Sequence, residues 1–211
     1  MLLFFVGSLG MVLLYRFAPV PATPLMVWRT MQGLMDGEFV GINKDWVSLE
    51  DISPSVQKAV LKAEDYRFFE HNGFDFDAIQ KAMKYNKTSK RIKGASTISQ
   101  QTAKNVFLWP GRDWVRKGFE AYYTVLIEMV WPKDRILEVY LNVIEMGPGV
   151  YGVEAAAQKY FKKSAKKLNS GEASLMAAVG ARARRDGARC GGRARSGPRS
   201  PGRAGAPPHR S

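Results

Sequence analysis

The sequence has little of what builds disulfide-bonded or zinc-binding proteins. Among its 211 residues there is one cysteine, Cys190, and there are two histidines, His71 and His209. One cysteine excludes an intrachain disulfide and any cysteine-based metal cluster, and two histidines leave little material for a zinc site. Alternating strand patterns are also scarce, and residues 38–49 hold a hairpin at most. The chain is 45% hydrophobic and 24% charged, which indicates one globular domain with a sizeable core.

Residues 180–211 lack every large apolar side chain. They contain nine arginines and one aspartate, so they carry +8 of the formal net charge of +13. A segment with no large apolar side chain to bury cannot offset the entropy of ordering, so we expect disorder here. Gly, Ala, Arg and Pro, the residues of GC-rich codons, make up 26 of these 32 residues, and the helical pattern stops abruptly after Val179. We therefore interpret the segment as a frameshift product, in preference to a basic tail for nucleic acid or anionic lipid.

Residues 1–17 have the opposite composition, being uncharged up to Arg16 and mostly apolar. Fifteen helical residues cover about 22 Å, which is less than the roughly 30 Å of a bilayer core. Uniform apolarity favours a membrane helix over a buried core helix, and the missing basic n-region argues against a secretory peptide. We interpret the segment as the C-terminal part of a transmembrane anchor. Pro19, Pro21 and Pro24 then predict an extended linker over residues 18–30.

Helical periodicity dominates residues 31–179, so the predicted fold class is mostly α. Ser53-Pro54 has the chemistry of a helix start, and Asp75 to Asp77 can cap a short helix that points Ile79 and Met83 inward. Thr97 and Gln100 have the spacing of a capping box.

The longest periodic run is 113–131, which carries an apolar seam over nearly five turns. Pro132 ends that run and begins a helix with Ile136, Tyr140 and Val143 on one face. Residues 147–149 read Gly-Pro-Gly, which predicts a turn. Further helices are expected from about Gly152 and from Ser170. The seam of the longest run consists of Val115, Phe119, Tyr122, Leu126 and Met129.

A first polar cluster, EDYRFFEHNGFD, occupies residues 64–75. Apolar surroundings disfavour the charged form of a carboxylate, so Glu64, where a helix meets aromatic residues, is a candidate general base. The alternative is that Glu64 and Asp65 are ordinary solvated acids. His71 by itself is interpreted as a structural hydrogen-bonding residue rather than a base.

Two more polar clusters follow. Residues 94–105 read GASTISQQTAKN, a small-residue turn with hydroxyls and amides at a helix start, which suits phosphate and sugar groups. A plain capping box is the alternative there. Arg112, Arg116 and Glu120 form the third cluster, in which a carboxylate lies among cations and could help position a charged leaving group. Its alternative is an exposed ion pair between residues four apart.

Together the clusters form an ordered set: E-D-x-x-F-x-x-H-x-G-x-D, then G-x-S-T-I-x-Q-Q-x-x-K-N, then R-K-x-x-E. They are followed by EVYLN at residues 138–142 and YGVEAAA at residues 151–157. This set resembles the peptidoglycan glycosyltransferases of glycosyltransferase family 51, in their monofunctional form without a transpeptidase domain. The resemblance covers residues 13–179, and it identifies residues 31–179 as a glycosyltransferase domain that is incomplete at its C-terminal end.

The resemblance implies a lysozyme-like helical fold and polymerisation of lipid II into β-1,4-linked glycan with release of undecaprenyl diphosphate. Glu64 matches the base that deprotonates the acceptor 4-hydroxyl, and Glu120 matches the second essential Glu on the donor side. A divalent cation, Mg²⁺ or Mn²⁺, is allowed at Glu120, and no organic cofactor is implied. The remaining implied substrate contacts are Ser96, Thr97, Gln100, Gln101, Lys104, Asn105, Arg112 and Arg116.

The expected partners are lipid II, the growing glycan chain, the membrane and other cell-wall synthesis or division proteins, but not nucleic acid. The expected location is the inner membrane, single-pass, with the catalytic domain on the periplasmic side. Inversion at an α-linked sugar diphosphate needs one base and positive charge on the departing diphosphate, which the cations between the two Glu motifs supply. Two rival interpretations remain, a lysozyme-like lytic muramidase and a catalytically silent cell-wall scaffold. A phosphate-binding motif argues against the first, because a hydrolase protonates an alkoxide leaving group instead.

Overall fold

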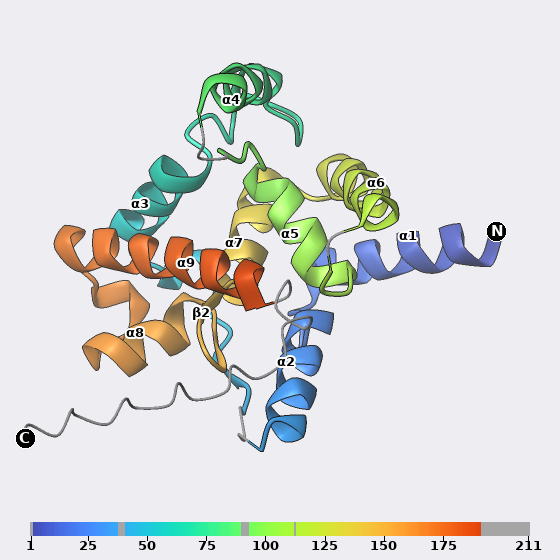
Figure 1. Cartoon of the computed structure of the whole chain (residues 1–211). Helices are drawn as coiled ribbons and strands as arrows, with labels where there is room; N and C mark the ends of the chain where they lie inside the picture. The colour runs from blue at the N-terminus through green and yellow to red at the C-terminus, as the bar shows by residue number, and fades with distance from the viewer. Residues whose placement is uncertain (1, 38–40, 90–92, 112, 191–211) are drawn as a thin grey trace, which may run out of the picture.

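The computed structural model describes residues 2–37, 41–89, 93–111 and 113–190, with side chains up to residue 183. This part of the chain is mostly helical, as predicted (Figure 1). Its short strands are β1 (Asn43–Lys44), β2 (Glu145–Gly147) and β3 (Val150–Tyr151), and single 3-10 turns lie at Leu49–Asp51 and Ala165–Lys167. Its helices are α1 (Leu2–Phe17), α2 (Pro24–Met35), α3 (Pro54–Glu64), α4 (Phe76–Thr88), α5 (Ile98–Phe107), α6 (Trp114–Val130), α7 (Lys133–Val143), α8 (Val153–Phe161) and α9 (Ser170–Cys190).

The predicted helix starts are confirmed in detail. Asp75 caps α4 by accepting a hydrogen bond from the Ala78 amide at 2.9 Å. Thr97 and Gln100 form the expected capping box at the start of α5, because each side chain accepts from the other residue's backbone N–H. Ser53 caps α3, with Pro54 as its first helical residue. Each of these helix starts depends on a side chain that caps a backbone N–H group two or three residues away, so it can be predicted from the sequence.

The strands form one small sheet of order β1-β3-β2. β2 and β3 are antiparallel and joined by the predicted turn at Pro148 and Gly149, where Gly149 has a φ of +70°. β1 pairs in parallel with β3 rather than folding into a hairpin of its own. The described residues of the 38–49 segment therefore do not form the hairpin allowed by the sequence, and residues 38–40 lie outside the description.

Helix α7 is the centre of the core. The face expected to be buried is buried, since Ile136, Tyr140 and Val143 are all inaccessible to solvent. α5 packs against both α6 and α7, and α9 crosses α3 and β2 on the other side of the molecule (Figure 1). Eight of the ten residues of α5 are buried, and only Lys104 and Phe107 are half-buried, so this helix offers a ligand little more than one edge.

The apolar seam of α6 faces the core only in its middle part, where Phe119, Tyr122 and Leu126 are half-buried and pack against the core. Val115 and Met129 are 67% and 77% exposed, whereas Arg116, Glu120 and Tyr123 on the opposite side are buried. The prediction that Met83 of α4 points inward was also wrong, because its side chain is 59% exposed. α6 therefore buries the charged side chains of Arg116 and Glu120 together with Ile127, and it exposes apolar side chains at both ends of its seam, which is unusual for a surface helix.

Helix α1 lies along part of this seam. Phe4 contacts the rings of Phe119 and Tyr122, and Ser8 shares a 2.7 Å hydrogen bond with the Tyr122 hydroxyl. With 16 residues, α1 falls short of a bilayer crossing, and no helix in the described part of the chain is long and apolar enough for one. The transmembrane anchor expected at residues 1–17 is therefore not supported. The linker is also shorter than expected, since α2 begins at Pro24 with Thr23 as its cap.

The prediction that the last helix ends near Val179 was wrong. α9 continues to Cys190, and its Gly180 is buried against β2, where an added Cβ would lie 3.0 Å from Met146 Sδ. The expected disorder of the 180–211 segment thus does not begin at residue 180. Residues 191–211 lie outside the description.

Candidate active site

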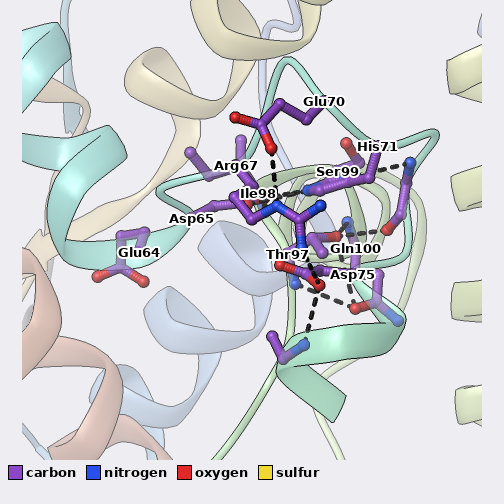
Figure 2. Close-up of polar contacts among 12 residues, drawn as sticks. Glu64, Asp65, Arg67, Glu70, His71, Asp75, Thr97, Ile98, Ser99 and Gln100 are labelled. Carbon is purple, nitrogen blue, oxygen red and sulfur yellow. Dashed lines mark hydrogen bonds and ion pairs between the residues drawn. The ribbon is translucent and has the colours of Figure 1, made fainter. Parts of the chain in front are cut away.

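Two neighbouring carboxylates at the end of α3 point in different directions. Glu64 is the last helical residue, and Asp65 is the C-terminal cap, with φ −160° and ψ 80°. Figure 2 shows Asp65 turned into a network of polar contacts and Glu64 turned away from it. The change of backbone direction at Asp65 therefore separates a carboxylate that holds the structure from one directed elsewhere.

Asp65 joins three segments of the chain. Its buried carboxylate lies 3.0 and 3.1 Å from His71 Nε2 and accepts a 2.9 Å hydrogen bond from the Ile98 amide at the start of α5. His71 Nδ1 in turn accepts from the Gly73 amide at 3.2 Å, so Nε2 carries the proton donated to Asp65. This confirms His71 as a structural hydrogen-bonding residue. The solvated-acid alternative is wrong for Asp65, which is 7% exposed.

The start of α5 is attached to the same loop. Thr97 Oγ1 donates a 2.6 Å hydrogen bond to the Gly73 carbonyl, and Gly73 has a φ of +87°. An added Cβ at Gly73 would meet the Thr124 methyl at 2.7 Å, so glycine is required there by both conformation and space. The loop between α3 and α4 is thereby fixed to α5 and packed against α6.

Glu64 faces α5 through Gln101. Gln101 Nε2 donates to Glu64 Oε2 at 3.2 Å and lies 3.4 Å from the Ser96 carbonyl. The Tyr140 hydroxyl of α7 donates to Gln101 Oε1 at 3.4 Å, which fixes the amide so that its NH₂ faces Glu64. Glu64 is half-buried and Ser96 is exposed, so the carboxylate lies at the edge of the protein where a ligand can reach it.

A second carboxylate lies on the buried face of α6. Glu120 is 3% exposed and accepts hydrogen bonds from Arg116 Nη1 at 3.3 Å and from Lys117 Nζ. The exposed-pair alternative is therefore wrong. Arg116 Nε is buried without a hydrogen-bond partner among the described residues. An unsatisfied buried donor costs about 1–3 kcal/mol, so an acceptor supplied by a ligand would be favoured there.

The donor set at Glu120 does not fit a protein-built metal site. Its oxygens already accept from two cations, whose charge opposes that of a divalent ion. In the described residues no group of three or more His, Cys, Asp or Glu side chains converges on a point. We derive no step through a metal.

The remaining predicted residues are distributed along α5 and its borders. Gln100 and Asn105 are buried, Gln100 within the capping box, and Lys104 is half-buried. Burial raises the pKa of the Glu145 carboxyl on β2. The positive charge of Lys104 lowers this pKa by a smaller amount. Arg112 lies outside the described residues.

Two polar groups at this site were missed from the sequence. Lys117, the second residue of R-K-x-x-E, joins Glu120, and its position three residues before the Glu was the available signal. Glu128 accepts from Ser99 and, at 2.8 Å, from Lys133, which also donates to the His71 carbonyl at 2.6 Å. No local pattern marks the second group, because its members come from three different helices.

The aromatic and aliphatic side chains between the second and third motifs divide into two pairs. Phe107 stacks on Tyr123 with ring centroids 4.5 Å apart, and Leu108 is buried, so both belong to the core. Trp109 and Trp114 are 45% and 91% exposed. Residues 87–93, just before the second motif, contain four basic side chains; Lys87 and Lys93 are exposed, while Lys90 and Arg91 lie outside the described residues.

With this geometry established, comparison with known proteins gives one consistent result. A family model described as Transglycosylase matches residues 33–188, which is most of the chain. The chain belongs to the transglycosylase family. It is a glycosyltransferase enzyme, as the motifs predicted, and the family's match extends past the predicted domain end at residue 179 into α9.

Individual relatives agree. The "Biosynthetic peptidoglycan transglycosylase" of Bdellovibrio bacteriovorus is 79% identical over 178 residues, which cover 84% of this chain and 71% of the relative. The protein of that name from Haemophilus influenzae strain PittEE is 56% identical over 180 residues, 84% of this chain and 75% of the relative. That from Bacteroides thetaiotaomicron is 56% identical over 179 residues, 85% of this chain and 72% of the relative.

Proposed function

We propose that this transglycosylase polymerises lipid II into β-1,4-linked glycan strands and releases undecaprenyl diphosphate, with Glu64 as general base. The observation that carries the proposal is the separation of the two carboxylates at the end of α3. Asp65 is fully engaged in the structure, while Glu64 reaches the edge of the protein beside the amide of Gln101. A positioned carboxylate at an accessible edge is what deprotonation of a sugar hydroxyl requires.

The proposed reaction is a single displacement. Glu64 takes the proton of the acceptor 4-hydroxyl as that oxygen bonds to C1 of the donor sugar. The bond from C1 to the diphosphate oxygen breaks, and its electron pair leaves with the diphosphate. Attack opposite an α-linked leaving group gives a β-linked product.

Arg116 and Lys117 are proposed to stabilise the charge on the departing diphosphate. Arg116 is buried, and no described residue hydrogen-bonds to its Nε, while Lys117 extends from the same turn of α6. Glu120 holds both cations, so in this proposal it orients them and takes no proton. Lys104, Thr97, Ser96 and Gln101 are proposed as further contacts to phosphate and saccharide.

The same arrangement argues against a lytic muramidase. A hydrolase that cleaves a glycosidic bond needs a second carboxylic acid to protonate the leaving alkoxide. The oxygens of Glu120 accept hydrogen bonds from two cations and are not placed to donate a proton.

We also propose that the enzyme works at the surface of the inner membrane, with its catalytic part on the periplasmic side. The outward faces of α1 and α6 carry large exposed apolar side chains, and Trp109 and Trp114 lie close to the same end of α6. An apolar face rimmed by aromatic residues suits contact with lipid.

The test is to incubate the detergent-solubilised protein with labelled lipid II and to separate the products by size. We expect polymer, and we expect moenomycin to abolish it. Cleavage of preformed glycan without polymer formation would support the muramidase instead. The absence of both reactions from a folded protein would support a silent scaffold.

A further inference from the structure

The connection between α1 and α2 is held by side chains from distant parts of the chain. Arg135 of α7 donates to the Tyr15 carbonyl at 2.8 and 3.1 Å and to the Ala18 carbonyl at 2.5 Å. Lys44 of β1 donates to the Val20 carbonyl at 2.5 Å and lies 3.4 Å from that of Pro21. Two cationic side chains therefore contact four backbone carbonyls between residues 15 and 21. One of these, Tyr15, lies in the last turn of α1, where helical carbonyls have no partner of their own.

Both cations also contact one indole ring. Lys44 Nζ lies 5.1 Å and Arg135 Cζ 5.2 Å from the ring centroid of Trp46. Arg135 is further fixed by its ion pair with Glu138, and its side chain is 12% exposed. Burial lowers the pKa of Lys44. These are not solvated surface cations, and we refer to Lys44, Trp46 and Arg135 as the linker clamp.

The clamp continues a series of contacts along α1. Ser8 bonds to Tyr122 of α6, and the Trp131 indole N–H donates to the Val12 carbonyl at 2.7 Å. Val12 itself is inaccessible to solvent. α1 is thus contacted at three positions along its length: at Ser8 by Tyr122 of α6, at Val12 by Trp131, and at Tyr15 by the linker clamp. A helix held at three points cannot pivot about its linker.

We propose that Lys44, Trp46 and Arg135 are positioning residues that fix the angle between α1 and the domain, so that a lipid-linked diphosphate substrate held in a membrane meets Glu64 in the correct position. The proposal rests on the proposed function. Its reason is geometric. If α1 contacts lipid through its outward face, any rotation between α1 and the domain displaces Glu64 from a substrate whose lipid tail stays in the bilayer. A substrate that is free in solution can reorient with the domain and does not need the clamp.

The test compares two substrates and one double variant. Lys44→Met with Arg135→Gln removes the donors and charges of the clamp while keeping similar side-chain lengths. The matched control is Lys58→Met with Lys81→Met, two exposed lysines on α3 and α4. Each protein is assayed with native lipid II in vesicles and with a short-chain lipid II analogue dispersed in detergent. Hydrogen exchange of residues 15–22 is measured on the same samples.

We expect the clamp variant to lose about tenfold or more of the rate in vesicles, in line with the cost of a small misplacement, and to change less than about twofold with the dispersed analogue. Amides of residues 15–22 should exchange faster in the clamp variant only. Equal losses with both substrates, an unchanged rate in vesicles, or unchanged exchange would overturn the proposal. Inactivity of the parent protein with both substrates would refute the proposed function instead. In that case, unchanged hydrogen exchange of residues 15–22 in the clamp variant would still refute the role of the clamp.

Discussion

At the scale of single residues, the account depends on what distinguishes Glu64 from Asp65. The two are adjacent and chemically similar, yet Asp65 is bound by His71 and the Ile98 amide, whereas Glu64 accepts a hydrogen bond from the Gln101 side-chain amide at the edge of α5. The difference arises because α3 ends between them. Chemistry is therefore assigned to Glu64 and structural support to Asp65.

Glu64→Gln tests the first assignment. The variant keeps the shape of the side chain and the contact with Gln101 but cannot take up a proton. We expect a fall of about 10²–10⁴-fold in polymerisation at an unchanged melting temperature. Glu50→Gln, at an exposed position, is the matched control. Turnover of Glu64→Gln within a few-fold of the parent would remove Glu64 from the mechanism.

Glu145→Gln tests the pH dependence of stability. Burial raises the pKa of Glu145 in the folded protein, although Arg29, 3.4 Å away, acts in the opposite direction. An acid with a raised folded pKa stabilises the fold below its unfolded pKa, and this stabilisation is lost as pH rises through the folded pKa. In urea unfolding between pH 4 and pH 7, the parent should therefore lose more stability with rising pH than the variant. Identical slopes would contradict the assignment.

At the scale of elements, the starts of helices were predictable and the facing of α6 was not. The side chains that cap these helices hydrogen-bond to backbone N–H groups two or three residues away, so the sequence shows their roles directly. These residues are Ser53, Asp75, Thr97 and Gln100. The apolar seam of α6 correctly predicted a helix, but the exposure of its ends, Val115 and Met129, could not be read from the periodicity, because it depends on how α1 and the core cover the middle of the seam. The meeting of Glu64 with Gln101 likewise requires α3 and α5 to come together, and only the resemblance to a known family brought both residues into one site.

The end of α9 gives a test at this scale. Truncation after Val179 removes Gly180, which packs against Met146 of β2, together with the helical residues that follow it. Truncation after Cys190 removes only residues 191–211, which have no large apolar side chain. We expect the first truncation to lower the free energy of unfolding by about 1–3 kcal/mol and the second to leave it unchanged. If the two truncated proteins are equally stable, the folded part ends near residue 180, as the sequence predicted.

At the scale of the whole molecule, the exposed apolar side chains concentrate in two regions, one on α1, α2 and α6 and a smaller one on α4 and the loop before it. α1, α2 and α6 carry many of them, and α9 lies on the opposite side of the molecule (Figure 1). The net charge of +13 by itself would suggest a nucleic-acid-binding protein. However, +8 of this charge lies in residues 180–211, so the rest of the chain is only moderately basic. The exposed apolar side chains of α1, α2 and α6 support the proposed contact with lipid.

Trp114→Gln tests the contact with lipid. Trp114 is 91% exposed, so its replacement should leave the melting temperature unchanged. Loss of an indole that is partly buried in lipid should weaken binding to anionic vesicles by about 1 kcal/mol, or about fivefold. Leu175→Gln, at an exposed position on α9, is the control and should bind like the parent. Equal binding by all three proteins would exclude this end of α6 from the lipid contact.

The most direct test of the central claim is to count both products of one reaction. Labelled lipid II is incubated with the purified protein, and the β-1,4 linkages formed and the undecaprenyl diphosphate released are measured in the same sample over time. The account predicts that they appear in equal amounts, and that both disappear together in Glu64→Gln. Release of saccharide fragments from preformed glycan, with no diphosphate released from lipid II, would contradict it.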